Sequence, residues 1–273
     1  MLPGLFAFDL DGTLLNDRKE LSGANLRALQ EMAAGGAVIV FASGRLGSAM
    51  RKFVPPALGE VAMLTLNGAA VYTGRSKGAQ KILDAPLSDT IADQLMDYAP
   101  GRPFGCNYYI DDLLYAVRNG TTAPWLKLYH DQTGAQYHFV EDLERFRGRA
   151  PSKMLFVGDT AIIDKQEEYF KDLWGGAVYV CRTWDHYLEF LDPKANKATG
   201  LEVLAKEYGV EWRDIAAFGD AANDIPMLEK AGYGIAMANA TEEVKRAAGR
   251  VSQWSNNEDG VAREWERMKK ACR

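Results

Sequence analysis

The sequence predicts an α/β fold in which a Rossmann-like core, a parallel sheet with helices on both faces, is interrupted by an inserted α+β domain. Short apolar runs alternate with amphipathic segments at both ends of the chain, as in parallel α/β sheets. The middle of the chain carries aromatic-rich runs that suit antiparallel strands. At 273 residues the chain exceeds a usual single domain. We therefore expect a core formed by residues 1–83 and 192–273 and an insert at 84–191.

The first section of the chain has a strand–helix–strand pattern. Residues 5–8 form an apolar run that ends at Asp9, as a buried strand does when it enters a loop. Ser22 is suited to cap a helix that ends at Gly35 and Gly36. The further elements expected here are strands at 38–42 and 61–66 and a hairpin at 72–83 about Gly74 and Gly78.

The middle and last sections differ in pattern. In the middle, a helix at 88–98 precedes aromatic-rich strands at 104–110 and 113–117, and Asp111-Asp112 between them predicts an antiparallel hairpin. The other elements expected in the insert are helices at 124–131 and 166–174 and strands at 137–140, 153–157, 177–181 and 187–191. After residue 192 the first pattern returns, with helices at 199–208, 225–230, 241–248 and 261–270 and strands at 215–218 and 234–237.

Charge and hydropathy exclude several classes of protein. The chain holds 32 Lys and Arg against 37 Asp and Glu, so it has no general attraction for nucleic acid or an anionic membrane. Any phosphate that it binds needs a local site. No apolar run reaches the length of a membrane span and the first residues lack a secretion signal, so we expect a cytoplasmic protein. Cys106, Cys181 and Cys272 are widely spaced and are expected to be reduced thiols rather than a disulfide framework or zinc site.

The segment Asp9-Leu10-Asp11-Gly12-Thr13 places two carboxylates at the end of the first predicted strand, where open α/β sheets hold their ligands. Asp9 and Asp11 could be turn-forming acids only. Two close carboxylates repel each other, however, and a hard cation such as Mg²⁺ relieves that repulsion while a substrate phosphate shares the ion. A carboxylate is also a competent nucleophile toward phosphorus. The segment therefore favours phosphoryl chemistry.

Two further segments offer partners for a phosphate. Ser43 and Gly44 follow the second core strand, and a hydroxyl and a backbone N–H suit phosphate oxygens, although a simple turn is the alternative. Arg45 could bind substrate or pair with a local acid. Lys194 and Lys197 precede a predicted helix, and either could be a surface lysine. A site that holds carboxylates and a phosphate nevertheless needs a fixed ammonium group.

The last segment, Gly219-Asp220-Ala221-Ala222-Asn223-Asp224, again lies where a strand ends and a helix begins. Asp220 could be a helix N-cap only. Together, Asp220, Asn223 and Asp224 span the first helical turn and could supply a carboxylate to a cation and an amide to a phosphate. A helix cap alone does not require three polar residues.

In this order, Asp-x-Asp-Gly-Thr, Ser-Gly-Arg, Asn-Lys-x-x-Gly and Gly-Asp-x-x-Asn-Asp resemble the motifs of the haloacid dehalogenase-like superfamily of phosphatases. The large insert between the second and third motifs is similar to the C2 cap of the Cof-type branch of that superfamily. The resemblance covers residues 1–83 and 192–273, and in the insert it rests on placement and strand-rich texture. Ala198 stands where many relatives have Gly.

The resemblance implies a role for each of these residues. Asp9 would be the nucleophile and a Mg²⁺ ligand, and Asp11 the general acid and base whose backbone carbonyl also contacts the metal. Asp220 would complete the metal ligands, and Asp224 would orient metal-bound waters. Lys197 would hold Asp9 and the phosphate together and is preferred to Lys194 because only Lys197 fits the motif. The residues implied in phosphate binding are Leu10 through its N–H, Ser43, Gly44, Lys197 and Asn223.

These roles imply a Mg²⁺-dependent phosphatase that hydrolyses a small soluble phosphomonoester, such as a sugar phosphate or a similar metabolite, through an aspartyl-phosphate. A phosphomutase of the same superfamily is one alternative, and it would return the phosphoryl group to another substrate oxygen rather than to water. A non-catalytic ligand-binding or regulatory protein on the same fold is another, although such a protein would have no need of Asp11.

Overall fold

The computed structural model describes residues 2–59, 61–74 and 78–271. The chain divides into two units. The first joins Met1–Leu83 to Asn196–Arg273, and the second is the segment between them, Asp84–Ala195. The second unit thus ends at Ala195, whereas the sequence suggested residue 191. Each unit has its own sheet.

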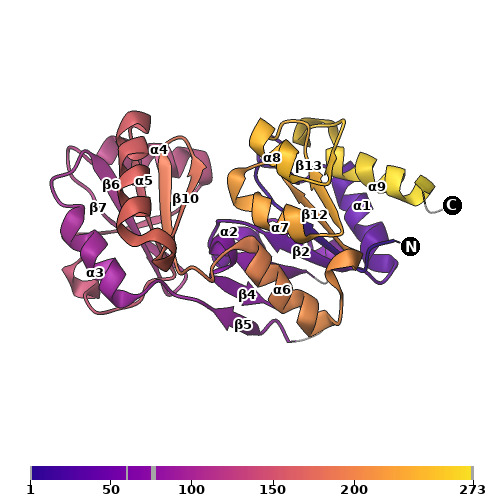
Figure 1. The fold of residues 1–273 in the computed structure, drawn as a ribbon, viewed down its shortest axis with the longest axis horizontal. Coiled ribbons are helices and arrows are strands. Elements are labelled where there is room, and N and C mark those ends of the chain that lie inside the picture. Colours follow the sequence, from indigo (N-terminus) through magenta and orange to yellow (C-terminus); the bar gives the residue numbers. More distant parts are fainter. Residues whose placement is uncertain (1, 60, 75–77, 272–273) are drawn as a thin grey trace. The chain divides into compact units, whose positions relative to one another are not determined.

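The first unit contains an eight-stranded sheet with the order β14-β13-β12-β1-β2-β3-β4-β5 (Figure 1). From β14 to β3 each pair of neighbours is parallel, and β4 is antiparallel to β3. This confirms the predicted parallel core sheet. Its strands are β1 (Leu5–Phe8), β2 (Val38–Ala42), β3 (Ala62–Thr65), β4 (Ala70–Tyr72), β5 (Lys81–Asp84), β12 (Ile215–Gly219), β13 (Tyr233–Ala236) and β14 (Arg250–Val251).

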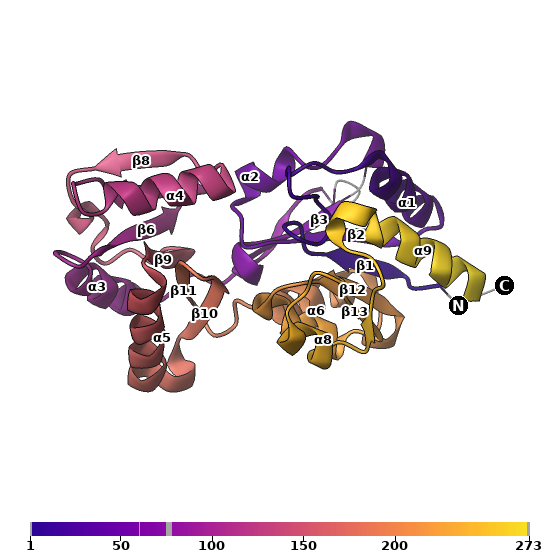
Figure 2. The same ribbon diagram turned by 90° about the horizontal axis from the view of Figure 1, so that it is seen from above.

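Helices cover both faces of this sheet because the strand side chains alternate between two apolar clusters. Phe6 and Phe8 belong to a cluster with residues of α1 and α9, and Leu5 and Ala7 belong to one with residues of α6, α7 and α8. Figure 2 shows the two helix layers on opposite sides of β1 and β2. The helices of this unit are α1 (Gly23–Ala34), α2 (Gly47–Arg51), α6 (Lys197–Tyr208), α7 (Ile225–Lys230), α8 (Glu242–Ala247) and α9 (Gly260–Ala271).

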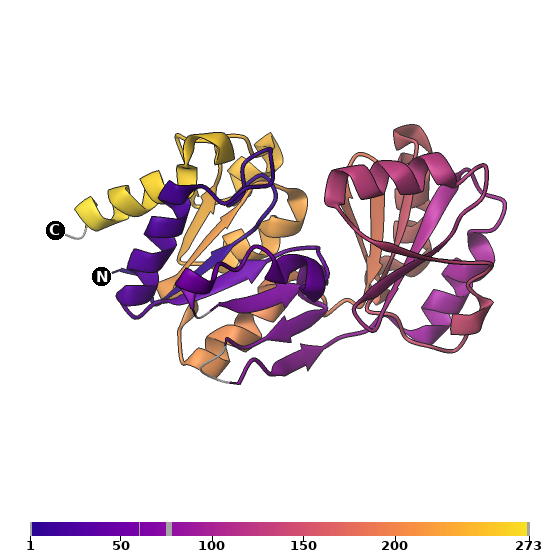
Figure 3. The same ribbon diagram turned by 180° about the vertical axis from the view of Figure 1, so that it is seen from behind.

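The N- and C-terminal segments pack together in the first unit. Helix α1, drawn in indigo, and helix α9, drawn in yellow, lie side by side (Figure 3). Ser22 caps α1 by accepting a hydrogen bond from the backbone N–H of Asn25, as the sequence predicts. The side-chain oxygen of Asn25 accepts from the backbone N–H of Ala262, which links the start of α1 to the start of α9.

The second unit carries a six-stranded sheet with the order β10-β11-β9-β6-β7-β8, in which only the described β7–β8 pair is parallel. Helices α3 and α5 supply side chains to its apolar cluster, and α4 lies along the opposite face (Figure 2). The predicted α+β character of the insert is confirmed. Its elements are α3 (Asp89–Tyr98), β6 (Phe104–Ile110), β7 (Leu113–Val117), α4 (Ala123–Thr133), β8 (Tyr137–Val140), β9 (Lys153–Gly158), α5 (Thr160–Trp174), β10 (Tyr179–Trp184) and β11 (Tyr187–Leu191).

The structure departs from the predicted elements mainly at their ends. Helix α5 begins six residues before the predicted position 166, because Asp159 accepts a hydrogen bond from the N–H of Ala161 and so caps an earlier turn. The five-residue helix α2 was not predicted. Of the predicted hairpin, residues 75–77 lie outside the described residues, as does Cys272, whereas Cys106 and Cys181 are described and buried. Among the described helices, none is long and apolar enough to cross a membrane.

Candidate active site

The predicted site residues of the first unit meet at the carboxyl ends of its parallel strands. Asp9 follows β1, Ser43 follows β2 and Asp220 follows β12, and these three strands are adjacent in the sheet. The backbone N–H of Asp9 donates to the carbonyl of Phe218 at 3.0 Å, which extends the β1–β12 pairing to the site. This edge is where open α/β sheets bind ligands.

A buried lysine joins two of the acids. The Nζ of Lys197 lies 2.6 Å from Oδ1 of Asp9 and 2.5 Å from Oδ1 of Asp224. Lys197 is the first residue of α6, whose N-cap, Asn196, accepts from the N–H of Thr199. The start of this helix therefore determines where the lysine side chain lies in the site, and the two carboxylates hold its ammonium group in place.

Three carboxylates, two of them bonded to this ammonium group, lie close together. Asp9, Asp220 and Asp224 each offer an oxygen, and these oxygens all lie within 4.8 Å of one another. Oδ1 of Asp220 accepts a hydrogen bond from the hydroxyl of Thr13 at 2.6 Å. Both oxygens of Asp224 are engaged, Oδ1 by Lys197 and Oδ2 by the backbone N–H groups of Asp220 and Ala221.

The charges of the cluster are not balanced by the lysine alone. Burial raises the pKa of Asp9 well above its usual value, Lys197 opposes this rise, and the neighbouring carboxylates add to it. Burial, together with the charge of Asp224, raises the pKa of Asp220 to about 7 against the opposing effects of Thr13 and Lys197. Burial disfavours the charged form of Lys197, but Asp224 and Asp9 outweigh it and raise its pKa, so its ammonium is retained. The cluster therefore has an unmet demand for positive charge.

The donor set fits a hard divalent cation. Asp9 and Asp220 each use Oδ1 in the contacts above, and the second oxygen of each is a candidate ligand. Carboxylate oxygens are the ligands that Mg²⁺ prefers. Since both oxygens of Asp224 already hold other groups, this residue supports Lys197 and the Asp220 loop. The sequence suggested contact with metal-bound waters for Asp224 and did not predict its contact with Lys197.

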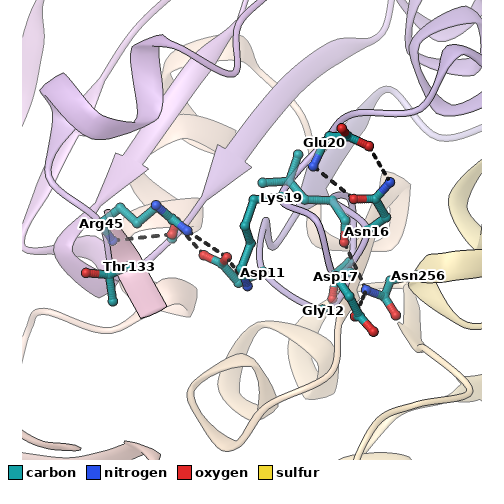
Figure 4. A network of polar contacts seen from close by, with 12 residues as sticks. Asp11, Gly12, Asn16, Asp17, Lys19, Glu20, Arg45, Thr133 and Asn256 are labelled. Atoms are coloured by element: carbon teal, nitrogen blue, oxygen red, sulfur yellow. Dashed lines mark hydrogen bonds and ion pairs between the residues drawn. The ribbon is translucent and has the colours of Figure 1, made fainter. Parts of the chain in front are cut away.

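Asp11 points into a different set of contacts (Figure 4). Its carboxylate receives two hydrogen bonds from Arg45, Nε to Oδ2 at 2.6 Å and Nη2 to Oδ1 at 2.7 Å, and an ion pair from Lys19 at 2.8 Å. Burial disfavours this carboxylate, but Arg45 and Lys19 outweigh burial and lower the pKa of Asp11 to about 2. Of the two partners that the sequence allowed for Arg45, the local acid is the one observed.

The predicted phosphate-binding groups lie around the same edge. Ser43 is buried, and its Oγ accepts a hydrogen bond from the backbone N–H of Arg45 at 3.3 Å. Asn223 is buried in a short 3₁₀ turn, Ala222–Asp224, before α7. Leu10 is buried between the two acids of its segment, with its carbonyl accepting from the N–H of Leu15.

Three residues in this region were not given a role from the sequence. Thr13 holds Asp220, and Asn239 donates from Nδ2 to the carbonyl of Gly12 at 2.7 Å, which braces the loop after β1. Asn67 accepts a hydrogen bond from Asn223 at 2.9 Å. Thr13 belongs to the first motif and Asn67 directly follows the strand predicted at 61–66, so the sequence indicated where both residues lie. Their partners, however, lie more than a hundred residues away along the chain.

Comparisons with known proteins agree with this geometry. Residues 6–264 match the haloacid dehalogenase-like hydrolase family. The chain is 29% identical over 272 residues to 5-amino-6-(5-phospho-D-ribitylamino)uracil phosphatase YitU of Bacillus subtilis, covering 96% of each chain. It is 28% identical over 240 residues to an HMP-PP phosphatase of Cronobacter sakazakii, covering 88% of this chain and 86% of that protein.

A solved structure gives the same result for the fold. A haloacid dehalogenase-like hydrolase from Bacteroides thetaiotaomicron superposes with a TM-score of 0.84 at 27% identity, covering 97% of this chain and 99% of that one. The parallel α/β core, with a buried acid cluster and a lysine at the carboxyl ends of its strands, is the arrangement of a hydrolase of this class. The chain belongs to the haloacid dehalogenase-like hydrolase family, which confirms the resemblance found in its motifs.

Proposed function

We propose that this protein is a Mg²⁺-dependent phosphatase of the cytoplasm that hydrolyses a small soluble phosphomonoester, such as a sugar phosphate or a similar metabolite, through an aspartyl-phosphate. The first unit is its catalytic core and the second its cap domain. The observation that carries the proposal is the fully buried Lys197, held between Asp9 and Asp224 in an otherwise acidic cluster. The same enzyme class is supported by relatives that are named as phosphatases and that match most of the chain.

The cation would be held by the carboxylates of Asp9 and Asp220 and by the backbone carbonyl of Asp11. It would offset the repulsion among the acids and give a phosphate oxygen a positive partner. Without such a cation, the raised pKa values of Asp9 and Asp220 would leave part of the cluster protonated. A protonated Asp9 would be a poor nucleophile.

In the first step, the carboxylate of Asp9 attacks phosphorus, and an oxygen–phosphorus bond forms as the bond to the leaving alkoxide breaks. Lys197 remains charged beside the reacting oxygen and stabilises the negative charge that builds on the phosphoryl group. Asp11 gives its proton to the alkoxide. The products of the step are the alcohol and a mixed anhydride of Asp9 with phosphate.

In the second step, Asp11 takes a proton from a water molecule whose oxygen attacks the same phosphorus. The bond between phosphorus and Asp9 breaks, which restores the Asp9 carboxylate and releases inorganic phosphate. The donors assigned to the phosphate through both steps are the Leu10 N–H, the Ser43 hydroxyl, the Gly44 N–H, the Lys197 ammonium and the Asn223 amide.

The observed position of Asp11 adds one requirement to these steps. A carboxyl with a pKa of about 2 that is bound by Arg45 and Lys19 cannot act as an acid near neutral pH. The side chain must therefore leave Arg45 and Lys19, take up a proton from solvent and turn toward the reacting oxygen, to which it then donates that proton. We assign the observed contact to the resting enzyme.

A panel of phosphorylated metabolites, assayed for released inorganic phosphate with and without Mg²⁺, tests the proposal. We expect hydrolysis of at least one member, dependent on Mg²⁺ and absent in Asp9→Asn. Isomerised product without free phosphate would support the phosphomutase alternative. Binding of panel members with no turnover would support the ligand-binding alternative.

A further inference from the structure

The turn after β3 has an unusual backbone. It is a short 3₁₀ turn, Leu66–Gly68, in which Leu66 (φ 52°) and Asn67 (φ 57°) are both left-handed although neither is glycine. Such a conformation is unfavourable for a branched side chain like that of leucine, although asparagine tolerates it. Backbone strain of this kind persists where the surroundings fix it and is concentrated at functional sites.

This turn is bonded to the segment predicted to bind phosphate. The N–H of Asn67 donates to the carbonyl of Ser43 at 3.0 Å, and the N–H of Leu66 donates to the carbonyl of Arg45 at 3.0 Å. The two bonds flank Gly44 on either side. The turn therefore fixes the backbone that carries the Gly44 N–H.

The same turn lies close to the residue before the catalytic lysine. A Cβ added to Gly68 would come within 2.5 Å of the carbonyl oxygen of Asn196, and Asn196 immediately precedes Lys197. The turn is thus packed between the Ser43–Arg45 segment and the start of α6. No side chain larger than hydrogen fits there without a shift of one of them.

The Asn67 side chain makes the third connection. It is 1% exposed, and its Oδ1 accepts a hydrogen bond from Nδ2 of Asn223 at 2.9 Å. A Cβ at Gly44 would lie 3.2 Å from the same Oδ1, so glycine allows the amide to lie against the loop backbone. One amide oxygen therefore both holds the Asn223 amide and lies against Gly44.

We propose that Asn67 is a positioning residue of the phosphate site: its side chain orients the Asn223 amide next to the Gly44 loop, so that the Asn223 amide and the Gly44 N–H face one phosphate. This inference rests on the proposed function, since it assigns Asn67 to the site where Asn223 and Gly44 would bind the substrate phosphate. The Asn67 side chain itself acts through Asn223. This role explains why a buried asparagine occupies a left-handed turn, although glycine would adopt that conformation with less backbone strain.

Replacement of Asn67 by glycine separates the side chain from the backbone, because glycine adopts a positive φ freely. We expect Asn67→Gly to keep the fold and its thermal unfolding midpoint, to lower kcat/KM for the most active phosphomonoester of the panel by about tenfold, and to weaken binding of inorganic phosphate by a similar factor. The Mg²⁺ concentration for half-maximal activity stays unchanged. Asp259→Gly is the matched control, since Asp259 is also left-handed (φ 57°) and in the first unit, and its kcat/KM stays at the wild-type value.

A double-mutant cycle with Asn223→Ala gives the decisive comparison. If Asn67 acts through Asn223, most of the effect of Asn67→Gly disappears in the Asn223→Ala background. Equal effects of Asn67→Gly in the two backgrounds would overturn the inference. So would wild-type phosphate binding and a wild-type kcat/KM in Asn67→Gly. In either case, hydrolysis by the wild-type protein would still uphold the proposed function. A wild-type protein that neither hydrolyses the panel nor binds inorganic phosphate with Mg²⁺, measured by calorimetry, would overturn both.

Discussion

At the scale of single residues, the site depends on a few buried charged groups, and removing the partner of any one of them destabilises the protein. Asp224 illustrates this point: it is fully buried, pairs with Lys197 and accepts two backbone N–H groups of the loop after β12. Removing one partner of a buried pair leaves the other charge unsatisfied and is costly.

We therefore predict that Asp224→Ala lowers the free energy of unfolding by about 3 kcal/mol and strongly reduces turnover. Urea denaturation and phosphate release measure the two effects. Glu202→Ala is the control, because Glu202 forms ion pairs with exposed Lys206 and Lys230 in the same unit, and a change below about 1 kcal/mol is expected there. A loss in Asp224→Ala no larger than that of the control would contradict the structural role given to Asp224.

At the scale of elements, short loops after the parallel strands bring the site together. Gly12 lies in the loop after β1 with φ +83°, and a Cβ at this position would lie 2.3 Å from Oδ2 of Asp220. The loops after β1 and β12 are therefore in close contact at the oxygen assigned to the metal. A side chain at position 12 must displace Asp220.

We expect Gly12→Ala to raise the Mg²⁺ concentration for half-maximal activity by about tenfold or more, because loss of a ligand's position costs at least that in metal affinity. Gly36→Ala provides the control. Gly36 also has a positive φ, +88°, but nothing lies within 4 Å of an added Cβ, so this variant has the backbone penalty without the clash. The same Mg²⁺ requirement in both variants would show that the clash with Asp220 has no effect on the metal.

The sheet of the second unit contains a comparable buried pair. Lys153 on β9 and Glu189 on β11 form an ion pair of 2.9 Å with both side chains almost fully buried. Glu189→Gln is predicted to lower the free energy of unfolding of this unit by about 3 kcal/mol, as measured by urea denaturation. Asp164→Asn, which breaks a more exposed pair with Arg182, is expected to change it by less than about 1 kcal/mol. Similar changes in both variants would mean that burial does not strengthen the Lys153–Glu189 pair.

At the scale of the whole molecule, the net charge of the chain and the charge of its expected phosphate substrate are both negative. The chain carries a net charge of −5, and three of its acids gather at the site, two of them paired with the buried Lys197. A bound divalent cation would offset part of this charge and bind the folded state only, so it should stabilise the first unit.

Thermal unfolding of the metal-free protein with increasing Mg²⁺ tests this linkage. Stabilisation should reach about 2.7 kcal/mol when free Mg²⁺ is about a hundred times the dissociation constant. In Asp220→Asn the shift should be much smaller, because one carboxylate ligand is lost. An equal shift in both proteins would place the bound cation elsewhere.

The sequence was informative where local pattern determines structure. Apolar runs ending in polar residues located β1, β2 and β12 within a residue. The rule that ligands lie at the carboxyl ends of parallel strands predicted that Asp9 and Asp220 lie close together, as they do in the structure. The five-residue helix α2 lacks enough turns to show an apolar period, so no pattern indicated it.

The finer arrangement of the site depends on partners that are distant in the chain. Neither the turn of Asp11 toward Arg45 nor the hydrogen bond between Asn67 and Asn223 follows from spacing, because each depends on side-chain orientation in the folded core. The support of Lys197 by Asp224 was missed for the same reason. Motifs identified the residue types of the site, and the tertiary structure determines which of them touch.

The most direct test of the account is detection of a phosphoryl group on Asp9. Asp11→Asn should slow hydrolysis of the aspartyl-phosphate, and acetyl phosphate, whose leaving group needs little protonation, should still form it with Mg²⁺. The account predicts that mass spectrometry of the acid-quenched Asp11→Asn protein finds the phosphoryl adduct on the peptide containing Asp9, and that Asp9→Asn/Asp11→Asn shows none. Phosphate release by the wild-type enzyme from acetyl phosphate, with no adduct on Asp9 in Asp11→Asn and with activity retained in Asp9→Asn, would contradict it.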